Sequence, residues 1–360
     1  MIQIFRAWFD RNFSDPRAVV LAVLLVLGFA LVIVASDILA PLFAAIVIAY
    51  LLDGPLERIV CCPGMPRIIA VSITLIVFML FITALLVIFM PLLFQQAGDF
   101  LREMPSMIGK GQQALLELPQ RYPQLFSEQQ VQDMLNAIRG ETTRLGQRVL
   151  SVSLSSIVSL ITMMVYLILV PLLVFFFLKD KDQILEWAKG FMPAEDSLAK
   201  QVWGEVNVKI GSYVRGKFME IIIVWAVTYV TLLTLGIDYA MLLSVMVGLS
   251  VIIPYVGAAI ATLPIAFVAY AQWGLESEFW YVMVAYGIIQ FLDGNLLVPL
   301  LFSEVVNLHP VAIISAVLLF GGLWGVWGVF FAIPLATLFQ AVLKAWPRQE
   351  HLEAVENAGE

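Results

Sequence analysis

Long apolar segments constrain the fold of this chain more than any other feature of its sequence. Residues 68–93, 152–178 and 279–302 each form a run long enough for an α-helix to cross a bilayer, which takes roughly 20 residues. Hydrophobic residues make up 61% of the chain and charged residues 13%. Soluble domains average about 45–50% and about 25%. The sequence therefore predicts an all-α polytopic integral membrane protein.

The apolar segments follow one another along the chain and differ in length. Six uninterrupted segments are predicted to be full spans, at residues 19–35, 38–52, 68–93, 152–178, 219–235 and 279–302. The segments 240–271 and 311–343 are predicted to be re-entrant helical hairpins. The expected fold thus has about six full spans and two hairpins, or about eight membrane segments.

Each hairpin segment consists of two apolar runs separated by a break that contains glycine. The runs of the first hairpin have about 14 residues, or roughly 21 Å as helices, whereas the hydrocarbon core is about 30 Å thick. The first break contains Pro254 and Gly257. The second break contains Gly325 and Gly328 and is followed by Pro334. The two tips are expected to meet near mid-depth. Alternatively, Trp324 and Trp327 mark a membrane interface between two short full spans.

Polar stretches divide the chain into parts. The predicted division is 1–94 for the N-terminal membrane segments, 95–150 for a polar helical extracytoplasmic insert, 151–178 for a span, 179–218 for a cytoplasmic amphipathic connector, 219–345 for the C-terminal transport core and 346–360 for a cytoplasmic tail. Pro105, Pro119 and Pro123 are expected to cut the insert into short helices. Residues 202–217 of the connector are expected to form a separate amphipathic helix at the membrane surface.

Basic residues indicate the orientation. Lys and Arg cluster in residues 179–217, and neither occurs between 218 and 343. Loops rich in Lys and Arg stay in the cytoplasm, so both termini, the 53–67 loop and the connector are expected there. The insert at 95–150 is then expected outside, because long loops cross largely regardless of charge.

Asp293 is the strongest candidate for a functional residue, because it lies near the middle of the span 279–302. A carboxylate at that depth costs about 2.5–3.5 kcal/mol on insertion scales and usually lies on a substrate or ion path. Gly294 and Pro299 weaken the same helix, and broken helices at mid-depth form the sites of many secondary transporters. Gln290 and Asn295 flank it and could bind a hydroxyl-rich solute. Alternatively, these side chains are satisfied by backbone groups or hold helices together.

Three further path candidates, Glu304, Asn307 and His309, follow the same span. Pro310 suits the first position of a helix, which places His309 at the cap. A helix start that faces a cavity can bind an anionic or hydroxyl-rich ligand. The alternative is a capping loop at the cytoplasmic edge. Glu220 lies near an end of the fifth span, where we expect it to be exposed to water.

Other residues are expected to shape turns and hinges rather than contact a solute. They are Pro254, Gly257, Gly294, Pro299, Pro310, Gly325, Gly328 and Pro334. No cofactor and no metal are expected, because Cys61 and Cys62 are adjacent and no His/Cys cluster accompanies them. An ATP-driven pump is disfavoured because the chain lacks a phosphate-binding loop motif. An aspartyl protease is disfavoured because the usual G-x-G-D context is missing before Asp293, so no enzyme activity is expected.

Several motifs together resemble the autoinducer-2 exporter (AI-2E) family of bacterial membrane proteins. They are P-Y-V-G at 254–257, D-G-N-L-L-V-P at 293–299, S-E-V-V-N-L-H-P at 303–310 and G-x-x-G at 325–328. The match is closest to the PerM-type permeases of that family. The resemblance implies a bacterial inner-membrane protein with re-entrant hairpins that forms a homo-oligomer, with a pentamer suggested. It also implies autoinducer-2 as a substrate, and some members are described as Na⁺/H⁺ antiporters.

The function expected from the sequence is a secondary transporter, a permease or exporter of a small polar solute such as autoinducer-2. H⁺ and Na⁺ are the candidate coupling ions, membrane lipid is an expected partner and nucleic acid is not. The alternatives are an ion transporter of the Na⁺/H⁺ antiporter kind, a passive pore and a membrane partner protein without transport activity.

Overall fold

The structure is a computed structural model that describes residues 23, 27–61, 64–121, 127, 129, 131–133, 135–136, 156–190, 197–302 and 308–345. In this part of the chain every regular element is a helix. The elements are α3 (Ser36–Val60), α4 (Arg67–Arg121), α6 (Ser156–Lys179), α7 (Lys181–Lys189), α8 (Ser197–Thr234), α9 (Ala240–Ser250), α10 (Val256–Trp273), α11 (Ser277–Leu292), the π-helical turn η1 (Asp293–Leu297), α12 (Val298–Phe302) and α13 (Pro310–Ala345).

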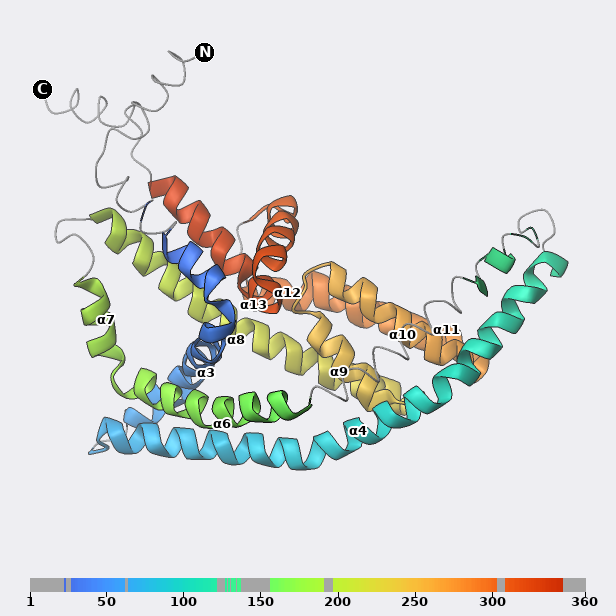
Figure 1. Ribbon diagram of the computed structural model, residues 1–360, viewed down its shortest axis with the longest axis horizontal. Coiled ribbons are helices and arrows are strands. Elements are labelled where there is room, and N and C mark those ends of the chain that lie inside the picture. The colour runs from blue at the N-terminus through green and yellow to red at the C-terminus, as the bar shows by residue number, and fades with distance from the viewer. Residues whose placement is uncertain are drawn as a thin grey trace, which may run out of the picture.

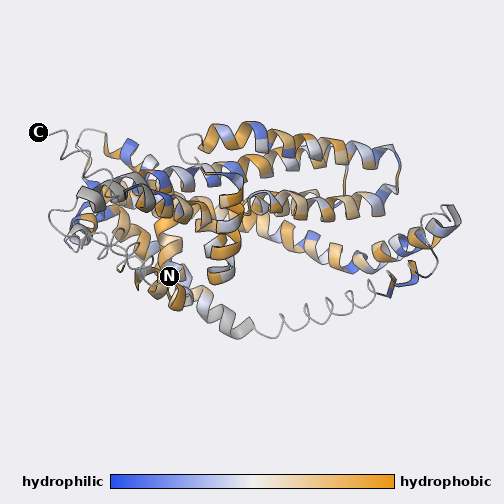
Figure 2. Cartoon of the chain, turned by 90° about the horizontal axis from the view of Figure 1, so that it is seen from above, coloured by the Kyte–Doolittle hydropathy of each residue, from blue (hydrophilic) through white to orange (hydrophobic). Residues whose placement is uncertain are grey.

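Seven helical segments within the described ranges are long and apolar enough to cross a membrane. Hydrophobic residues predominate along most of the helices, as the colours of Figure 2 show. Large side chains such as Leu80 and Phe81 on α4 are more than half exposed. Surfaces of this kind are typical of helices that face lipid, and a monomeric soluble protein rarely exposes so much apolar area. The prediction of an all-α polytopic membrane protein is therefore confirmed.

Helices α3, α4 and α6 pack together at the N-terminal end of the fold (Figure 1). The expected end of the second span at residues 53–55 is wrong, because α3 runs on through Gly54 and Pro55 to Val60. Leu56 is fully buried among the apolar side chains of α4 and α6. Burying a leucine contributes roughly 1.5–3 kcal/mol, which offsets part of the helix-propensity cost of the two preceding residues.

Helix α4 is a single curved helix that extends well beyond the expected third span (Figure 1). The prediction that Pro105 and Pro119 cut this region into short helices is wrong, since both lie inside α4, and Pro123 lies outside the described residues. The expected boundary between residues 94 and 95 therefore falls inside a helix. Hydrogen bonds to α9 and α10 hold α4 in place. Lys110 Nζ donates to the Ala271 carbonyl at 2.8 Å, and Gln96 Oε1 accepts from the Leu242 N–H at 2.9 Å.

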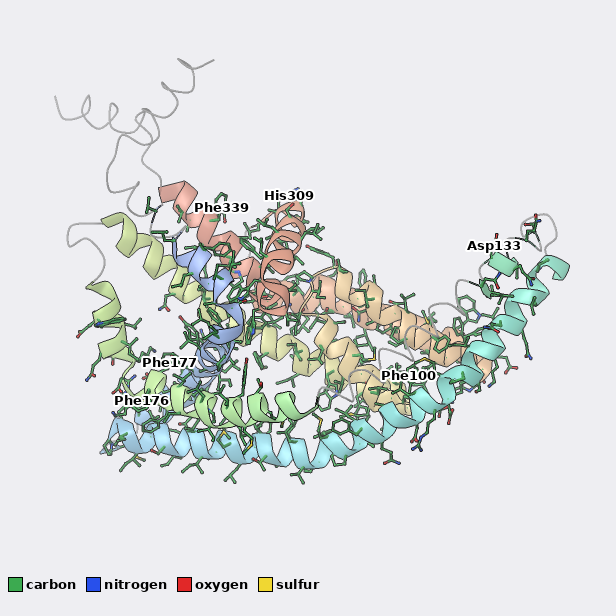
Figure 3. The ribbon with its side chains drawn as sticks, in the orientation of Figure 1. Phe100, Asp133, Phe176, Phe177, His309 and Phe339 are labelled. Atoms are coloured by element: carbon green, nitrogen blue, oxygen red, sulfur yellow. The ribbon has the colours of Figure 1, made fainter. Side chains whose placement is uncertain are left out.

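The aromatic rings of α4 add to this contact. Phe100 lies edge-on to the ring of Tyr239, with 5.4 Å between the ring centroids, and Figure 3 shows it on the side of α4 that faces α9. An aromatic pair of this geometry is worth about 0.5–1.5 kcal/mol beyond its buried area. Together these contacts offset part of the cost of prolines inside a helix, which is about 3 kcal/mol each for an interior position.

Helix α8 continues without a break from the expected connector into the expected fifth span. The prediction of a separate surface helix at 202–217 is therefore wrong, and the boundary at residue 218 lies inside a helix. Helices α3, α9, α12 and α13 surround α8 and bury side chains along much of its length. Tyr213 and Val214 are buried, and so are Lys217 and Glu220 at 3% and 2% exposure. The expectation that Glu220 is exposed to water is wrong for the same reason.

Two sharp turns reverse the chain where the sequence predicts breaks. The first joins α9 to α10 at residues 251–255, and Tyr255 has a φ of 64° there. The second lies inside α13, where Gly325 has a φ of 59° and a ψ of −138°, so that the two arms of α13 fold back on each other (Figure 1). Glycine adopts such a conformation without steric cost. The predicted positions of both breaks are confirmed.

The arms of both hairpins approach closely at a glycine that follows the turn. A Cβ atom at Gly257 would collide with the backbone carbonyl of Ser250, and one at Gly328 would collide with that of Phe320. The first turn also contacts the second hairpin, since Ile253 packs among the apolar side chains around Ala332 in α13. The chain therefore uses the same close approach twice, and it brings the two turns to the centre of the molecule.

Candidate functional site

The helix that carries Asp293 widens rather than breaks at the predicted weak point. Residues Asp293–Leu297 form a π-helical turn, in which the Val298 N–H bonds to the carbonyl of Asp293, five residues earlier. Pro299 follows in α12 and has no N–H to donate. Single π turns inside helices are rare and occur frequently at functional sites. The turn sets Asp293 at the wall of a cavity.

This central cavity has a volume of about 590 Å³ and lies between α8, the first turn and the α11–α12 segment. Small-molecule sites are typically about 300–1,000 Å³ and carry a few polar groups on an apolar lining. Here the polar and hinge residues of the wall include Tyr213, Lys217, Glu220, Pro254, Tyr255, Gln290, Asp293, Gly294 and Pro299. Tyr255 lies in a backbone conformation that is unfavourable for a residue other than glycine, and such conformations cluster at functional sites.

A buried ion pair crosses one wall of the central cavity. The Nζ of Lys217 lies 2.6 Å from Oε2 of Glu220, and the two side chains are only 4% and 3% exposed. Lys217 Nζ also donates to the Val251 carbonyl at 2.9 Å and lies 5.3 Å from the centre of the Phe302 ring. The lysine therefore links α8 to the first turn and to α12. Buried charges of this kind persist only with such compensation.

Asp293 lies within electrostatic reach of the same lysine. Its Oδ1 atom is buried and has no hydrogen-bond partner among the described residues. The same holds for Gln290 Nε2 and for the hydroxyl of Tyr213. Buried polar atoms are nearly always hydrogen-bonded, so these three atoms have unused hydrogen-bonding capacity at the cavity wall.

The charges of the cavity do not balance when all of them are ionised. Lys217 contributes one positive charge, and Glu220 and Asp293 contribute two negative charges. Nearby opposite charge favours an ionised group, whereas burial disfavours it. The cavity can therefore reach neutrality by taking up one proton or one cation.

Two predicted path residues lie away from the cavity wall. Asn295 is exposed, and its amide donates to the Phe291 carbonyl of its own helix at 2.9 Å. His309 is exposed at the start of α13, as Figure 3 shows, and its Nδ1 accepts from the Val311 N–H at 3.3 Å. Pro310 is the first residue of α13, so the predicted cap is confirmed. Glu304 and Asn307 lie outside the described residues.

The sequence therefore pointed to Gln290, Asp293 and Pro254, which lie together on this wall, but its interpretation missed Lys217 and Glu220. A signal for these two residues exists in their spacing. Opposite charges three residues apart share one face of a helix and can neutralise each other. An apolar run follows directly after Glu220, so a charge-neutral pair could have been read as part of the span.

The fold and the cavity together define a polytopic helical membrane protein with charged side chains buried at its centre. The model of the AI-2E family transporter matches residues 20–348, and the chain belongs to this family. A protein of Escherichia coli (strain K12), "Putative permease PerM", is 47% identical over 347 residues, which cover 96% of this chain and 98% of that protein.

More distant relatives occur in Bacillus subtilis (strain 168). "Putative transport protein YueF" is 26% identical and covers 82% of this chain and 80% of its own length. "Putative transport protein YrrI" is 23% identical and covers 86% of this chain and 87% of its own length. All three relatives carry the names of permeases or transport proteins, and none carries the name of an enzyme.

Proposed function

We propose that this protein is a secondary transporter that moves a small polar solute through the central cavity. The observation that carries the proposal is the buried Lys217–Glu220 ion pair with the half-buried Asp293 on the same cavity wall, beside a π turn and a hairpin turn. Ionisable groups at membrane depth are costly and mark substrate and ion pathways. The family and the names of the relatives support transport as the activity.

The excess negative charge of the cavity supports coupling to H⁺ or Na⁺. Asp293 is the group that takes up the proton or cation, because Lys217 is already paired with Glu220. Gln290 Nε2 and the Tyr213 hydroxyl supply neutral hydrogen bonds to the solute. A hydroxyl-rich molecule such as autoinducer-2 suits these groups. An antiporter that exchanges Na⁺ for H⁺ is the second candidate. The same excess negative charge could bind Na⁺ and H⁺ in turn, and no other solute would be needed.

The hairpins are the moving parts in this proposal. Helix α9 has 11 residues, or roughly 17 Å, and is too short to cross a hydrocarbon core of about 30 Å. This length supports a re-entrant first hairpin. Gly325 provides the hinge of the second hairpin, and the cavity is lined by the first turn and by Ile313 and Ile333 from the two arms of the second hairpin. A rigid-body shift of one hairpin against the other can open the cavity to alternate sides, as in other transporters with discontinuous helices.

Flux measurements in sealed proteoliposomes test this proposal. We expect saturable movement of at least one small polar solute, with a rate that changes when a proton or Na⁺ gradient is imposed. The panel contains autoinducer-2, other small polar metabolites and Na⁺ itself, and vesicles without protein are the control. Na⁺ and H⁺ flux without any solute would favour the antiporter. Flux that neither saturates nor responds to a gradient would show a passive pore instead.

The proposed orientation places both termini in the cytoplasm of a bacterial inner membrane and the 95–150 region outside. The basic residues of the connector and the stretch without Lys or Arg that follows it support this orientation. Reporter fusions at Pro105 are expected to show an external location, and fusions at Lys189 and Gln349 a cytoplasmic one. A cytoplasmic signal from the Pro105 fusion would reverse the orientation.

A further inference from the structure

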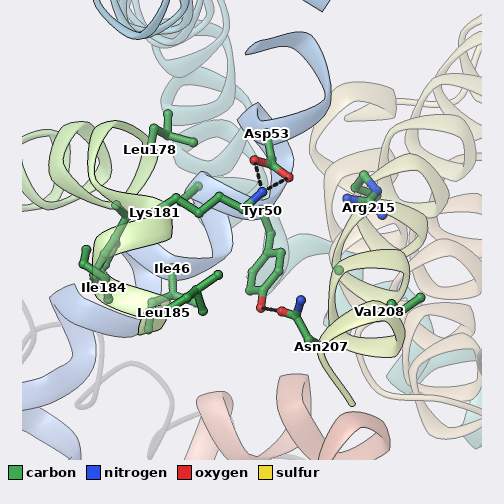
Figure 4. A pocket seen from close by; sticks show the side chains of 13 residues that line it. Ile46, Tyr50, Asp53, Leu178, Lys181, Ile184, Leu185, Asn207, Val208 and Arg215 are labelled. Atoms are coloured by element: carbon green, nitrogen blue, oxygen red, sulfur yellow. Dashed lines mark hydrogen bonds and ion pairs between the residues drawn. The ribbon is translucent and has the colours of Figure 1, made fainter. Parts of the chain in front are cut away.

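A second pocket lies on the opposite face of α8 from the central cavity. It has a volume of about 400 Å³ and is bounded by α3, by the junction of α6 and α7, and by α8 (Figure 4). Asn207, Gly211 and Arg215 follow one another at intervals of four residues, so they share one face of the helix. Lys217 and Glu220 lie about half a turn away on the other face. The second pocket is therefore distinct from the central cavity.

The wall of the second pocket is mainly apolar. Its apolar side chains are Ile46, Phe177, Leu178, Ile184, Leu185 and Val208. The pocket lies where α6 ends at Lys179 and α7 begins at Lys181, beside Asp53 of α3. Charged residues at the end of an apolar span lie at the level of the lipid headgroups. The pocket thus offers an acyl-chain environment next to the membrane surface.

Most polar groups of this pocket already have partners. Lys181 Nζ bonds to both carboxylate oxygens of Asp53, at 2.7 and 2.9 Å, and the Tyr50 hydroxyl donates to Asn207 Oδ1 at 2.6 Å (Figure 4). Arg215 is the exception, because its guanidinium has no hydrogen bond or ion pair with a described residue. The lining therefore has a net charge of +1, from Lys181 and Arg215 against Asp53.

Gly211 leaves room for the free guanidinium. A Cβ atom at this position would lie 3.3 Å from the Tyr50 ring and 3.5 Å from Nη1 of Arg215. The guanidinium therefore lies back along α8 near Gly211, with its donors available to a ligand in the pocket. A planar guanidinium binds phosphate oxygens through two parallel hydrogen bonds.

We propose that the second pocket binds one anionic phospholipid, with its phosphate on Arg215 and part of an acyl chain against the apolar wall. The single excess positive charge complements a lipid with one net negative charge. The apolar wall excludes a fully soluble anion as the best occupant, and basic pockets between membrane helices are known to hold anionic headgroups. This inference does not depend on the transport activity.

Lipid titrations of the purified, delipidated protein by native mass spectrometry test this site. Phosphatidylglycerol is expected to bind more tightly than phosphatidylcholine with the same acyl chains, and glycerophosphoglycerol without chains is not expected to bind. Arg215→Gln should weaken phosphatidylglycerol binding about tenfold, since hydrogen bonds to charged groups are among the strong ones. Arg102→Gln is the matched control, because Arg102 is 85% exposed on α4 and does not line the pocket.

A second variant keeps every charge and fills the pocket instead. Val208→Trp adds a large side chain from α8 at an exposed position of the wall, so folding is expected to survive while lipid binding is lost. Equal binding of both lipids, or equal loss in the Arg215 and Arg102 variants, would overturn the proposal. Competition by glycerophosphoglycerol at the concentration of the lipid would also overturn it, because the site would then be a simple anion site.

Discussion

Asp293→Asn is expected to leave the protein folded and in the membrane but to lower gradient-driven flux by at least about tenfold. The asparagine keeps the shape of the side chain and an amide that can hydrogen-bond, but it cannot take up a proton or neutralise a cation. Folding survives because Lys217 keeps its partner Glu220 at 2.6 Å, so the substitution leaves no buried cation unpaired. A bound solute or cation loses its interaction with the charged carboxylate in this variant; a hydrogen bond to a charged group contributes roughly 1.5–3 kcal/mol, which corresponds to tenfold or more in rate.

Flux in proteoliposomes at two pH values measures this effect for wild type, Asp293→Asn and Asp293→Glu. The glutamate variant keeps a titratable group and should keep a pH dependence at a reduced rate. Asp238→Asn is the matched control, since Asp238 is exposed and outside the cavity and loses the same charge. Unchanged flux with unchanged pH dependence in the Asp293→Asn variant would show that Asp293 is only a structural polar group.

The position of Asp293 could be predicted because the signal is local. A carboxylate inside an apolar run is visible in the sequence without any knowledge of the neighbouring helices, and so are the glycines of the two turns. Gly257 and Gly328 follow their breaks at similar places, and the structure shows the same close approach at both. Local backbone chemistry therefore predicts where this chain turns.

The missed features depend on contacts between segments that are distant in the sequence. Lys217 belongs to a stretch rich in basic residues, and only the packing of α9, α12 and α13 around α8 removes it from water. Pro105 in α4 is a helix breaker by propensity, but contacts with α9 and α10 hold the helix together around it. Tertiary contacts regularly override propensity in this way.

Lys217→Met is expected to destabilise the protein far more than Asp293→Asn does. Methionine has a similar volume and is apolar, but it leaves the Glu220 carboxylate buried without a cation and removes the hydrogen bond to the Val251 carbonyl. Removing one partner of a buried ion pair typically costs about 3–5 kcal/mol. Thermal unfolding in detergent and the yield of monodisperse protein measure this loss.

Glu220→Gln is expected to be milder than Lys217→Met, because Lys217 can still interact with the charge of Asp293. The double variant Lys217→Met, Glu220→Gln removes both charges of the pair and should regain much of the stability lost in the lysine variant. A double-mutant cycle of the wild type, the two single variants and the double variant isolates the energy of the pair. If Lys217 interacts only with Glu220, Glu220→Gln would leave a buried ammonium without a partner. Glu220→Gln would then destabilise the protein at least as much as Lys217→Met, which would contradict the prediction. A milder Glu220→Gln variant, which is the expected result, would mean that the lysine is shared between Glu220 and Asp293. Such sharing suits a coupled transport cycle, because protonation of Asp293 would then shift the lysine fully to Glu220.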